Sequence, residues 1–300
     1  DGNTLQINGE TFGGLVIPYV KQIPARLADV LTQMDGLPVF FVDAMPDQVI
    51  GQEEKAVRLP KSCVQVPLAN LSETLKAHGM YEVEAVPAYK YLSVYHYEKD
   101  RQIFMLLNES AEQRFAGNVY LPIGEDVVYY DAMKDCYENA KVKPAEDGKG
   151  VWVEVELEAG ESCVLMEKKE IVCEKAHRSF AEMTEGCNVI DLSEDWMVGK
   201  RKAKENPETM KMEAVKTLTP ISDTEPTFAG VIRYEKTFTL EDDRLPEEAY
   251  LKAEHVYEMM KVTVNGQQAG IRLAPPYQLP VGEYLNAGEN TLQIEVATTP

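Results

Sequence analysis

The first 80 residues alternate between short apolar runs and segments with a helical period. Apolar side chains recur between Ile23 and Met34 at the spacing of an amphipathic helix, and Pro24 suits the first turn of that helix. Apolar runs bounded by glycine or proline predict buried strands at 14–18, 38–42 and 63–66, and a second helix is expected at 72–78. These elements predict a small α/β layer with parallel strands over residues 1–80.

After Gly79 the apolar period changes to two, which is the period of half-buried strands. Residues 91–97 and 102–108 predict a hairpin that turns at Lys99 and Asp100. Further strands are expected at 118–121, 127–131, 151–155 and 162–166. Strands of this length and spacing predict an antiparallel β-sandwich over residues 81–168.

The last third of the chain is also β-rich. A β-like run at 188–192 precedes Trp196 and a charged stretch, and strands are expected at 231–238, 249–253, 260–264 and 291–296. Asn265-Gly266 favours the two positive φ angles of a type I′ hairpin turn. A jelly roll over residues 175–300 accounts for these strands, so the predicted fold class is multidomain and mainly β.

The chain is acidic, with 50 acidic residues, 30 basic residues and a formal net charge of -20. The densest basic run, Lys200 to Lys202, precedes Glu205 and is interpreted as a solvated loop. Because a nucleic acid requires a basic surface, we expect no nucleic-acid partner. No apolar run reaches the roughly 18 residues of a membrane span, so no membrane partner is expected.

The five cysteines lack CxxC spacing, and the four histidines are dispersed. This pattern predicts free thiols and favours a reducing compartment such as the cytoplasm. It gives no transition-metal site, because neither HxH nor HExxH spacing occurs.

Residues 250–296 resemble the galactose-binding-like jelly roll of family 2 and related glycoside hydrolases. The resemblance rests on Val262-Thr263-Val264-Asn265-Gly266, Pro275-Pro276-Tyr277 and Gly288-Glu289-Asn290, with Phe228-Ala229-Gly230 as the opening of the same domain. Residues 95–110 and 157–162 resemble the sandwich that follows the barrel in rhamnosidase-like hydrolases. Residues 10–80 resemble the α/β layer of such enzymes, which is flavodoxin-like or amidotransferase-like.

The resemblance omits the catalytic barrel. Glycosidases use two carboxyl groups about 5 to 9.5 Å apart, normally at the strand ends of a (β/α)8 barrel. Only a few βα units are visible here, so no catalytic residues are assigned. Acidic residues that occupy predicted loops or strands without an evident partner are Asp43, Asp47, Asp191, Asp195, Glu235 and Glu258.

The sequence therefore predicts the non-catalytic C-terminal part of a glycoside hydrolase that acts in carbohydrate degradation. Asp1 is neither an initiator methionine nor the start of a signal peptide, so a start within a longer protein is expected. The expected partners are an upstream catalytic barrel and a plant or host glycan. A stand-alone carbohydrate-binding module and a purely structural spacer are the alternatives.

Aromatic and planar polar side chains near the predicted loops or strand ends of the jelly roll could contact a sugar or the barrel. They are Trp196, Arg233, Tyr234, Arg272 and Tyr277. Pro275 and Pro276 predict a stiff loop that presents Arg272 and Tyr277 outwards. The resemblance is compatible with a calcium ion in a jelly-roll loop, but the sequence contains no DxDxDG run that would name its ligands.

Overall fold

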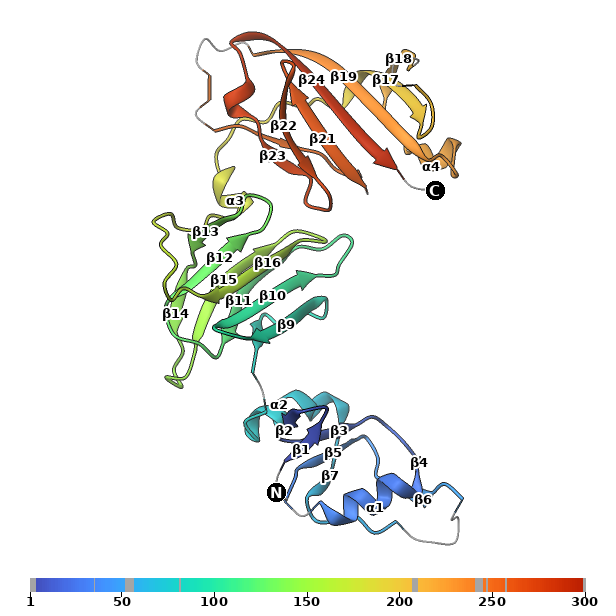
Figure 1. Cartoon of the computed structure of the whole chain (residues 1–300), viewed down its shortest axis with the longest axis vertical. Helices are drawn as coiled ribbons and strands as arrows, with labels where there is room; N and C mark the ends of the chain where they lie inside the picture. The colour runs from blue at the N-terminus through green and yellow to red at the C-terminus, as the bar shows by residue number, and fades with distance from the viewer. Residues whose placement is uncertain are drawn as a thin grey trace. The chain divides into compact units, whose positions relative to one another are not determined.

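The computed structural model describes residues 4–34, 36–51, 57–80, 82–206, 210–240, 245–246, 248–256 and 258–298. The chain separates into two compact units, Asp1–Glu84 and Ala85–Pro300. The second unit contains two β-sandwiches, called here the central and the C-terminal sandwich (Figure 1). The chain is mainly β with several antiparallel sheets, which confirms the predicted fold class.

A three-stranded parallel sheet forms the centre of the first unit, in the order β3 (Leu15–Ile17), β5 (Val39–Val42) and β7 (Cys63–Val66). Every residue of β5 is buried, as expected for the middle strand of a covered parallel sheet. Leu31 of α1 (Ala25–Gln33) joins the core that contains Val39 and Phe41. The predicted parallel strands and first helix are confirmed, and the second helix is α2 (Leu71–Ala77).

Short elements complete this unit. They are the antiparallel pair β1 (Leu5–Ile7) and β2 (Glu10–Phe12), the parallel pair β4 (Gln22–Ile23) and β6 (Gln48–Val49), and a 3-10 turn at Leu68–Asn70.

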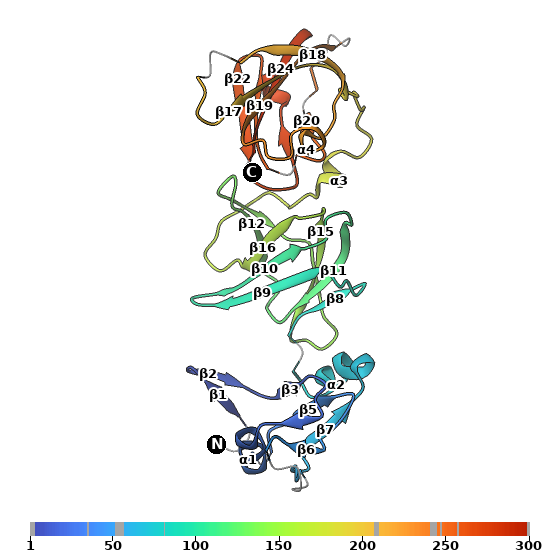
Figure 2. The same ribbon diagram turned by 90° about the vertical axis from the view of Figure 1, so that its right-hand side faces the viewer.

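The central sandwich consists of two antiparallel sheets (Figure 2). The five-stranded sheet has the order β13 (Cys136–Asn139), β12 (Val127–Asp131), β16 (Ser162–Glu167), β10 (Gln102–Asn108) and β9 (Leu92–Glu98). The four-stranded sheet has the order β14 (Val142–Pro144), β15 (Val151–Leu157), β11 (Phe115–Leu121) and β8 (Glu84–Val86). Alternate residues such as Phe104, Leu106, Val153 and Val155 are buried between the sheets.

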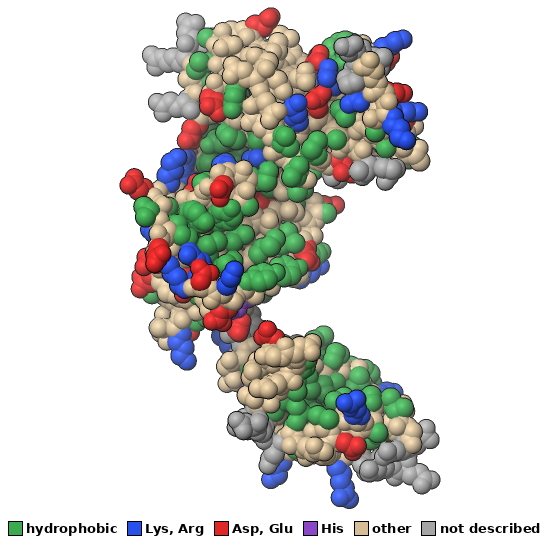
Figure 3. Space-filling model, viewed as in Figure 1, with side chains coloured by type: hydrophobic (Ala, Val, Ile, Leu, Met, Phe, Trp, Pro, Cys, Tyr) green, Lys and Arg blue, Asp and Glu red, His purple; other side chains and the backbone are tan. Residues whose placement is uncertain are grey.

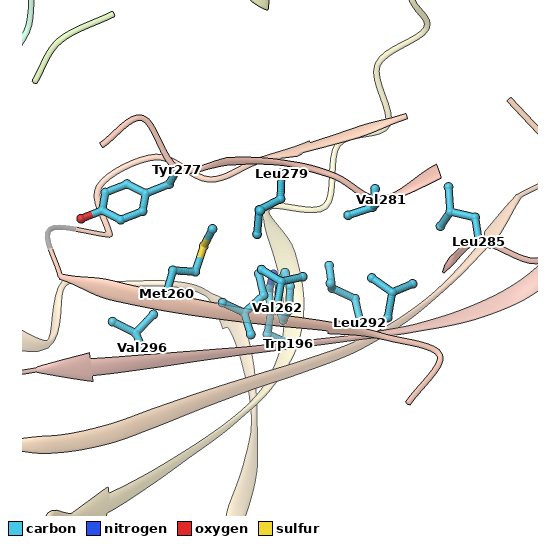
Figure 4. Packing of buried hydrophobic residues seen from close by; sticks show 11 residues of the cluster. Trp196, Met260, Val262, Tyr277, Leu279, Val281, Leu285, Leu292 and Val296 are labelled. Carbon is cyan, nitrogen blue, oxygen red and sulfur yellow. The ribbon is translucent and has the colours of Figure 1, made fainter. Parts of the chain in front are cut away.

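The C-terminal sandwich pairs a long sheet with a short one. The long sheet has the order β18 (Met212–Thr217), β17 (Glu194–Lys202), β19 (Gly230–Leu240), β24 (Gly288–Thr298), β21 (Met259–Val264) and β22 (Gln267–Arg272). The short sheet contains β20 (Tyr250–Lys252) and β23 (Gln278–Pro280). Leu279 and Val281 face Val262 and Leu292 across the core (Figure 4). Short helical segments are α3 (Phe180–Met183), α4 (Ile221–Thr224) and a 3-10 turn at Gly282–Tyr284.

The hairpin turn predicted from Asn265-Gly266 is confirmed. Asn265 has φ 50° and Gly266 has φ 77°, and the turn joins β21 to β22. Both residues are therefore in the left-handed region that a type I′ turn requires.

The segment between the sandwiches differs from the sequence-based expectation. Residues 188–192 do not form a strand, and the strand begins instead at Glu194. Lys200 to Lys202 lie within β17 and are paired with β19, so their interpretation as a loop is wrong. Neighbouring strands supply the backbone hydrogen bonds that outweigh the low strand propensity of the basic run.

Within the described ranges of the chain, none of the helices is long and apolar enough to cross a membrane.

Candidate functional site

The five candidate residues lie in the C-terminal sandwich, but they do not converge on one surface. Trp196 and Tyr277 belong to its buried core, and Tyr234 packs against that core. Arg233 lies on the opposite face of β19 from Tyr234, because neighbouring residues of a strand point to opposite sides of its sheet.

Trp196 is only 6% exposed and is held inside the sandwich. Its Nε1 donates a hydrogen bond of 2.7 Å to the carbonyl oxygen of Leu192. Its ring meets the Tyr234 ring edge-on, with the centroids 6.2 Å apart. These contacts satisfy the indole polar group and leave no open ring face of the kind that a sugar stacks on.

Arg233 takes part in an ion-pair ladder on the outward face of the long sheet. Its Nε and Nη2 donate hydrogen bonds of 3.1 and 2.9 Å to Oε1 of Glu295, and Lys261 Nζ lies 3.5 Å from the other carboxylate oxygen. Burial opposes ionisation of Glu295, but its hydrogen bond to Arg233 and the nearby positive charges of Arg233 and Lys261 outweigh this and lower its pKa. Arg233 is the one candidate whose head group lies among charged neighbours on an outward face.

Arg272 closes the loop that contains the two prolines. Its Nε donates a hydrogen bond of 2.8 Å to the carbonyl oxygen of Gln278, and Nη1 donates one of 3.2 Å to the carbonyl oxygen of Ile271. Burial lowers the pKa of its guanidinium, against the opposing charge of Asp131. The first of these bonds joins the end of β22 to the start of β23, and the second stays within β22.

Tyr277 is 6% exposed and packs with Met260 and Leu279 (Figure 4). Burial, followed by the charge of Glu258, raises the pKa of its hydroxyl, which has no hydrogen-bond partner among the described residues. The loop at residues 273–277 contains no strand, as expected from the prolines, but it turns the tyrosine inwards. The expected outward presentation of Tyr277 is therefore corrected.

A polar hollow that the sequence did not reveal lies beside the central sandwich. Its lining residues are Tyr129, Lys141, Glu154, Glu156, His177, Ser179 and Glu182. The His177 ring stacks on Tyr129 at a centroid distance of 3.7 Å, and His177 Nδ1 lies 2.8 Å from Glu138 Oε2. The Ser179 hydroxyl caps α3, while Lys141 pairs with Glu182 of the same helix.

These contacts attach the segment after β16 to the edge of the sandwich. The backbone N–H of His177 donates to the carbonyl oxygen of Asn139 at 2.8 Å, and Asn139 forms a parallel bridge with Ala176. The Lys141–Glu182 pair raises the pKa of the lysine and lowers that of the glutamate. The side chains of His177, Ser179, Lys141 and Glu182 take part in contacts that hold this segment on the sandwich, so we assign the hollow a structural role. The one sequence signal for it was the Ser179-to-Glu182 spacing of a capping box.

The turn between β15 and β16 carries a carboxyl group, that of Glu161, whose pKa is strongly shifted. Burial raises the pKa of Glu161 to about 7, although its carboxylate accepts a hydrogen bond of 2.7 Å from the backbone N–H of Glu158. The neighbouring charges of Glu158 and Glu156 act in the same direction as burial. The folded protein therefore binds a proton at Glu161 more tightly than the unfolded chain does.

Glu161 is expected to make stability depend on pH. Its contribution is fully present below pH 4.5 and is lost as the pH rises through about 7. Replacing it with glutamine should remove this dependence and raise the free energy of unfolding at pH 8 by up to about 3 kcal/mol relative to the parent chain. Urea unfolding at pH 5 and pH 8 measures the difference, and Glu125→Gln, at an exposed position, reports the general effect of removing one negative charge. Equal pH dependence in the parent and the Glu161 variant would contradict the assignment.

No group of three or more histidine, cysteine, aspartate or glutamate side chains is placed to hold a metal ion in the part of the chain that the structure describes. All five cysteines are free.

The fold of the whole chain is similar to that of part of one solved glycoside hydrolase. A rhamnosidase from Novosphingobium sp. PP1Y is similar over 100% of this chain and 30% of its own chain, at 16% sequence identity and a TM-score of 0.58. An FMN-binding beta-glucuronidase from Facaelibacterium prausnitzii L2-6 is similar over 37% of this chain and 18% of its own, at 19% identity and a TM-score of 0.31. The chain thus spans about 30% of the length of the rhamnosidase. No protein family and no curated protein matches the sequence.

Proposed function

We propose that this chain is a non-catalytic part of a longer glycoside hydrolase, in which it supports a catalytic barrel that precedes it. The observation that carries the proposal is the likeness of the whole chain to a stretch that makes up 30% of a rhamnosidase. The α/β layer and both sandwiches are included in that likeness, so the proposal concerns the chain as a whole.

The positions of the acidic residues support this proposal. A glycosidase requires two carboxyl groups that face a sugar from opposite sides. Asp43 Oδ1 instead accepts a hydrogen bond of 2.8 Å from the backbone N–H of Leu68, and Asp191 Oδ1 accepts one of 2.9 Å from the backbone N–H of Ser193. Glu295 is engaged by Arg233 and Lys261. These three carboxylates therefore have roles in turns and in the ion-pair ladder.

The test compares the 300-residue chain with the full-length gene product that contains it. The chain alone should release no aryl alcohol from a panel of aryl glycosides that includes rhamnosides, whereas the full-length protein should hydrolyse at least one of them. Variants of the acidic residues of the chain, such as Asp47→Asn, serve as the control and should leave the full-length activity unchanged. Turnover by the chain alone that is lost on substitution of one of its own carboxylates would contradict the proposal.

Contact with a glycan is the finer part of the proposal, and it centres on Arg233. Its guanidinium, together with Glu295 and Lys261, offers planar and charged groups of the kind that bind sugar hydroxyls. A glycan array probed with the parent chain and with Arg233→Met tests this role. If both proteins bind a glycan equally well, Arg233 is not part of the sugar site. If the parent chain binds no glycan, only the supporting role of the chain is retained.

A further inference from the structure

The outward face of the five-stranded sheet in the central sandwich is unusually apolar. Residues paired across the strands share a face, so the register places Tyr95 and Tyr97 of β9 beside Met105 and Ile103 of β10. Met105 is next to Val164 of β16, and Val164 is next to Tyr130 of β12. Alternate residues of the same strands, Phe104, Leu106 and Leu165, fill the sandwich core. Both faces of β10 and β16 are therefore apolar at these positions.

This face, called here the apolar face, is open over β9 and β10, whereas Val128 of β12 and Met166 of β16 on the same side of the sheet are buried. Tyr95 and Tyr97 are 45% and 60% exposed, and Ile103, Met105, Leu107 and Val164 are partly exposed. Figure 3 shows hydrophobic side chains gathered over the central sandwich on the side where Figures 1 and 2 place this sheet. The apolar face continues to Tyr130 and Tyr137, whose ring centroids are 5.0 Å apart.

The other sheet of the same sandwich provides an internal comparison. Its outward positions include Glu154 and Glu156 of β15 and Lys143 of β14, and Glu156 forms a 2.6 Å ion pair with Arg114. The paired outward positions of the five-stranded sheet carry no charged side chain, although 27% of the whole chain is charged. A sheet that faces water normally alternates apolar and polar residues, whereas a strand covered on both faces is continuously apolar, as Ile103 to Leu107 are.

We propose that the apolar face docks a further folded domain of the same polypeptide, through a neutral apolar surface of that domain. This inference rests on the proposed function, which supplies a longer polypeptide. The composition fits a protein contact, because uncharged aliphatic side chains form the centre and tyrosines, which are enriched in protein interfaces, flank it on both sides.

The size of the face favours a tethered domain over a second copy of the chain. Five strands spaced about 4.8 Å apart, with about five residues each, give a flat area of at most roughly 400 Å², part of which the buried Val128 and Met166 occupy. A stable contact between free proteins needs about 800 Å² from each partner, so the face supplies about half of that area. Contacts between domains of one chain are stable at smaller areas, because the linker keeps the domains at a high effective concentration.

Hydroxyl-radical footprinting, read by mass spectrometry, tests the proposal on the 300-residue chain and on the full-length gene product. Tyr95, Tyr97 and Met105 should react readily in the chain and about tenfold more slowly in the full-length protein, because the centre of an interface excludes water. Trp152 and Tyr120, on the outward face of the other sheet, are the internal controls and should react equally in both proteins. Equal reactivity of Tyr97 in the two proteins would overturn the proposal, as would a gene that encodes no further domain.

A substitution within the apolar face provides a second test. Met105→Lys in the full-length protein should restore the reactivity of Tyr95 and Tyr97, while Asn118→Lys on the outward face of the other sheet should not. Circular dichroism of both variants in the 300-residue chain confirms that they fold. If the parent chain dimerises and Met105→Lys abolishes the dimer, the face binds a second copy and the proposal is overturned. If the parent chain binds a glycan and Met105→Lys abolishes that binding, the face binds a sugar and the proposal is also overturned. Hydrolysis by the full-length protein is measured separately, so an inactive protein with a protected Tyr97 would refute the proposed function and retain the docking face.

Discussion

Replacing Asn108 with aspartate is expected to lower the free energy of unfolding by about 4 kcal/mol, because it places an uncompensated negative charge in a fully buried site. The Asn108 side chain is 0% exposed, and its Nδ2 donates to the carbonyl oxygens of Gln113 at 2.7 Å, Glu158 at 2.9 Å and Leu157 at 3.2 Å. Its Oδ1 accepts the backbone N–H of Ser110 at 3.1 Å. An aspartate oxygen in the place of Nδ2 would face three carbonyl oxygens and donate to none of them.

Urea unfolding of the 300-residue chain at pH 7, followed by far-ultraviolet circular dichroism, measures this loss. Asn188→Asp is the matched control, because it makes the same chemical change at an exposed position of the segment between the sandwiches and should change stability by less than about 0.5 kcal/mol. Equal stability of the two variants would mean that the Asn108 side chain does not hold together the end of β10, the end of β15 and the segment before β11.

Replacing Trp196 with alanine is expected to cost about 4 kcal/mol, because it removes a large buried ring and leaves a cavity in the C-terminal sandwich. Trp196 packs in the same core as Met260 and Leu292, and its indole N–H is satisfied inside the protein. The structural role predicts that Trp196→Phe, which retains most of the buried ring but not the N–H donor, has an effect of about half that size.

Trp152→Ala is the control for this experiment. Trp152 lies partly exposed on the outward face of the four-stranded sheet, where its ring meets Tyr120 with the centroids 5.6 Å apart, and its loss should cost about 1 kcal/mol. Urea unfolding supplies the stabilities, and a glycan array supplies the binding. A Trp196→Ala variant that keeps the parent stability and loses sugar binding would show that this tryptophan is a ligand contact.

The two surfaces proposed to make contacts differ in their charge. The proposed sugar contact at Arg233 is a charged ladder on the long sheet of the C-terminal sandwich, whereas the proposed docking face is the neutral sheet of the central sandwich. A docking surface lacks charge because a buried ion without a partner is costly, whereas a surface that binds hydroxyls needs polar groups. We therefore expect Arg233→Met to affect only the proposed sugar contact and Met105→Lys to affect only the proposed docking face.

The sequence by itself determined the local structure of this protein where short-range physics is sufficient. Runs of strand-forming residues on either side of Lys99 and Asp100 predicted the hairpin at 91–97 and 102–108, which the structure has at Leu92–Glu98 and Gln102–Asn108. Asn265-Gly266 predicted a turn whose positive φ angles few other residue pairs tolerate. It missed the start of β17 at Glu194, because residues 188–192 have strand-like composition without a neighbouring strand to pair with.

Only the tertiary structure decided which side chains are inside. Residues 103–107 are all apolar, so alternation could not tell the core-facing Phe104 and Leu106 from the outward Met105. The prolines at 275 and 276 predicted a loop, but the direction of Tyr277 depends on the space that Met260 and Leu279 leave for its ring. Facing residues come from strands far apart in the sequence, and the face on which a residue lies depends on the register and packing of those strands, which no single segment encodes.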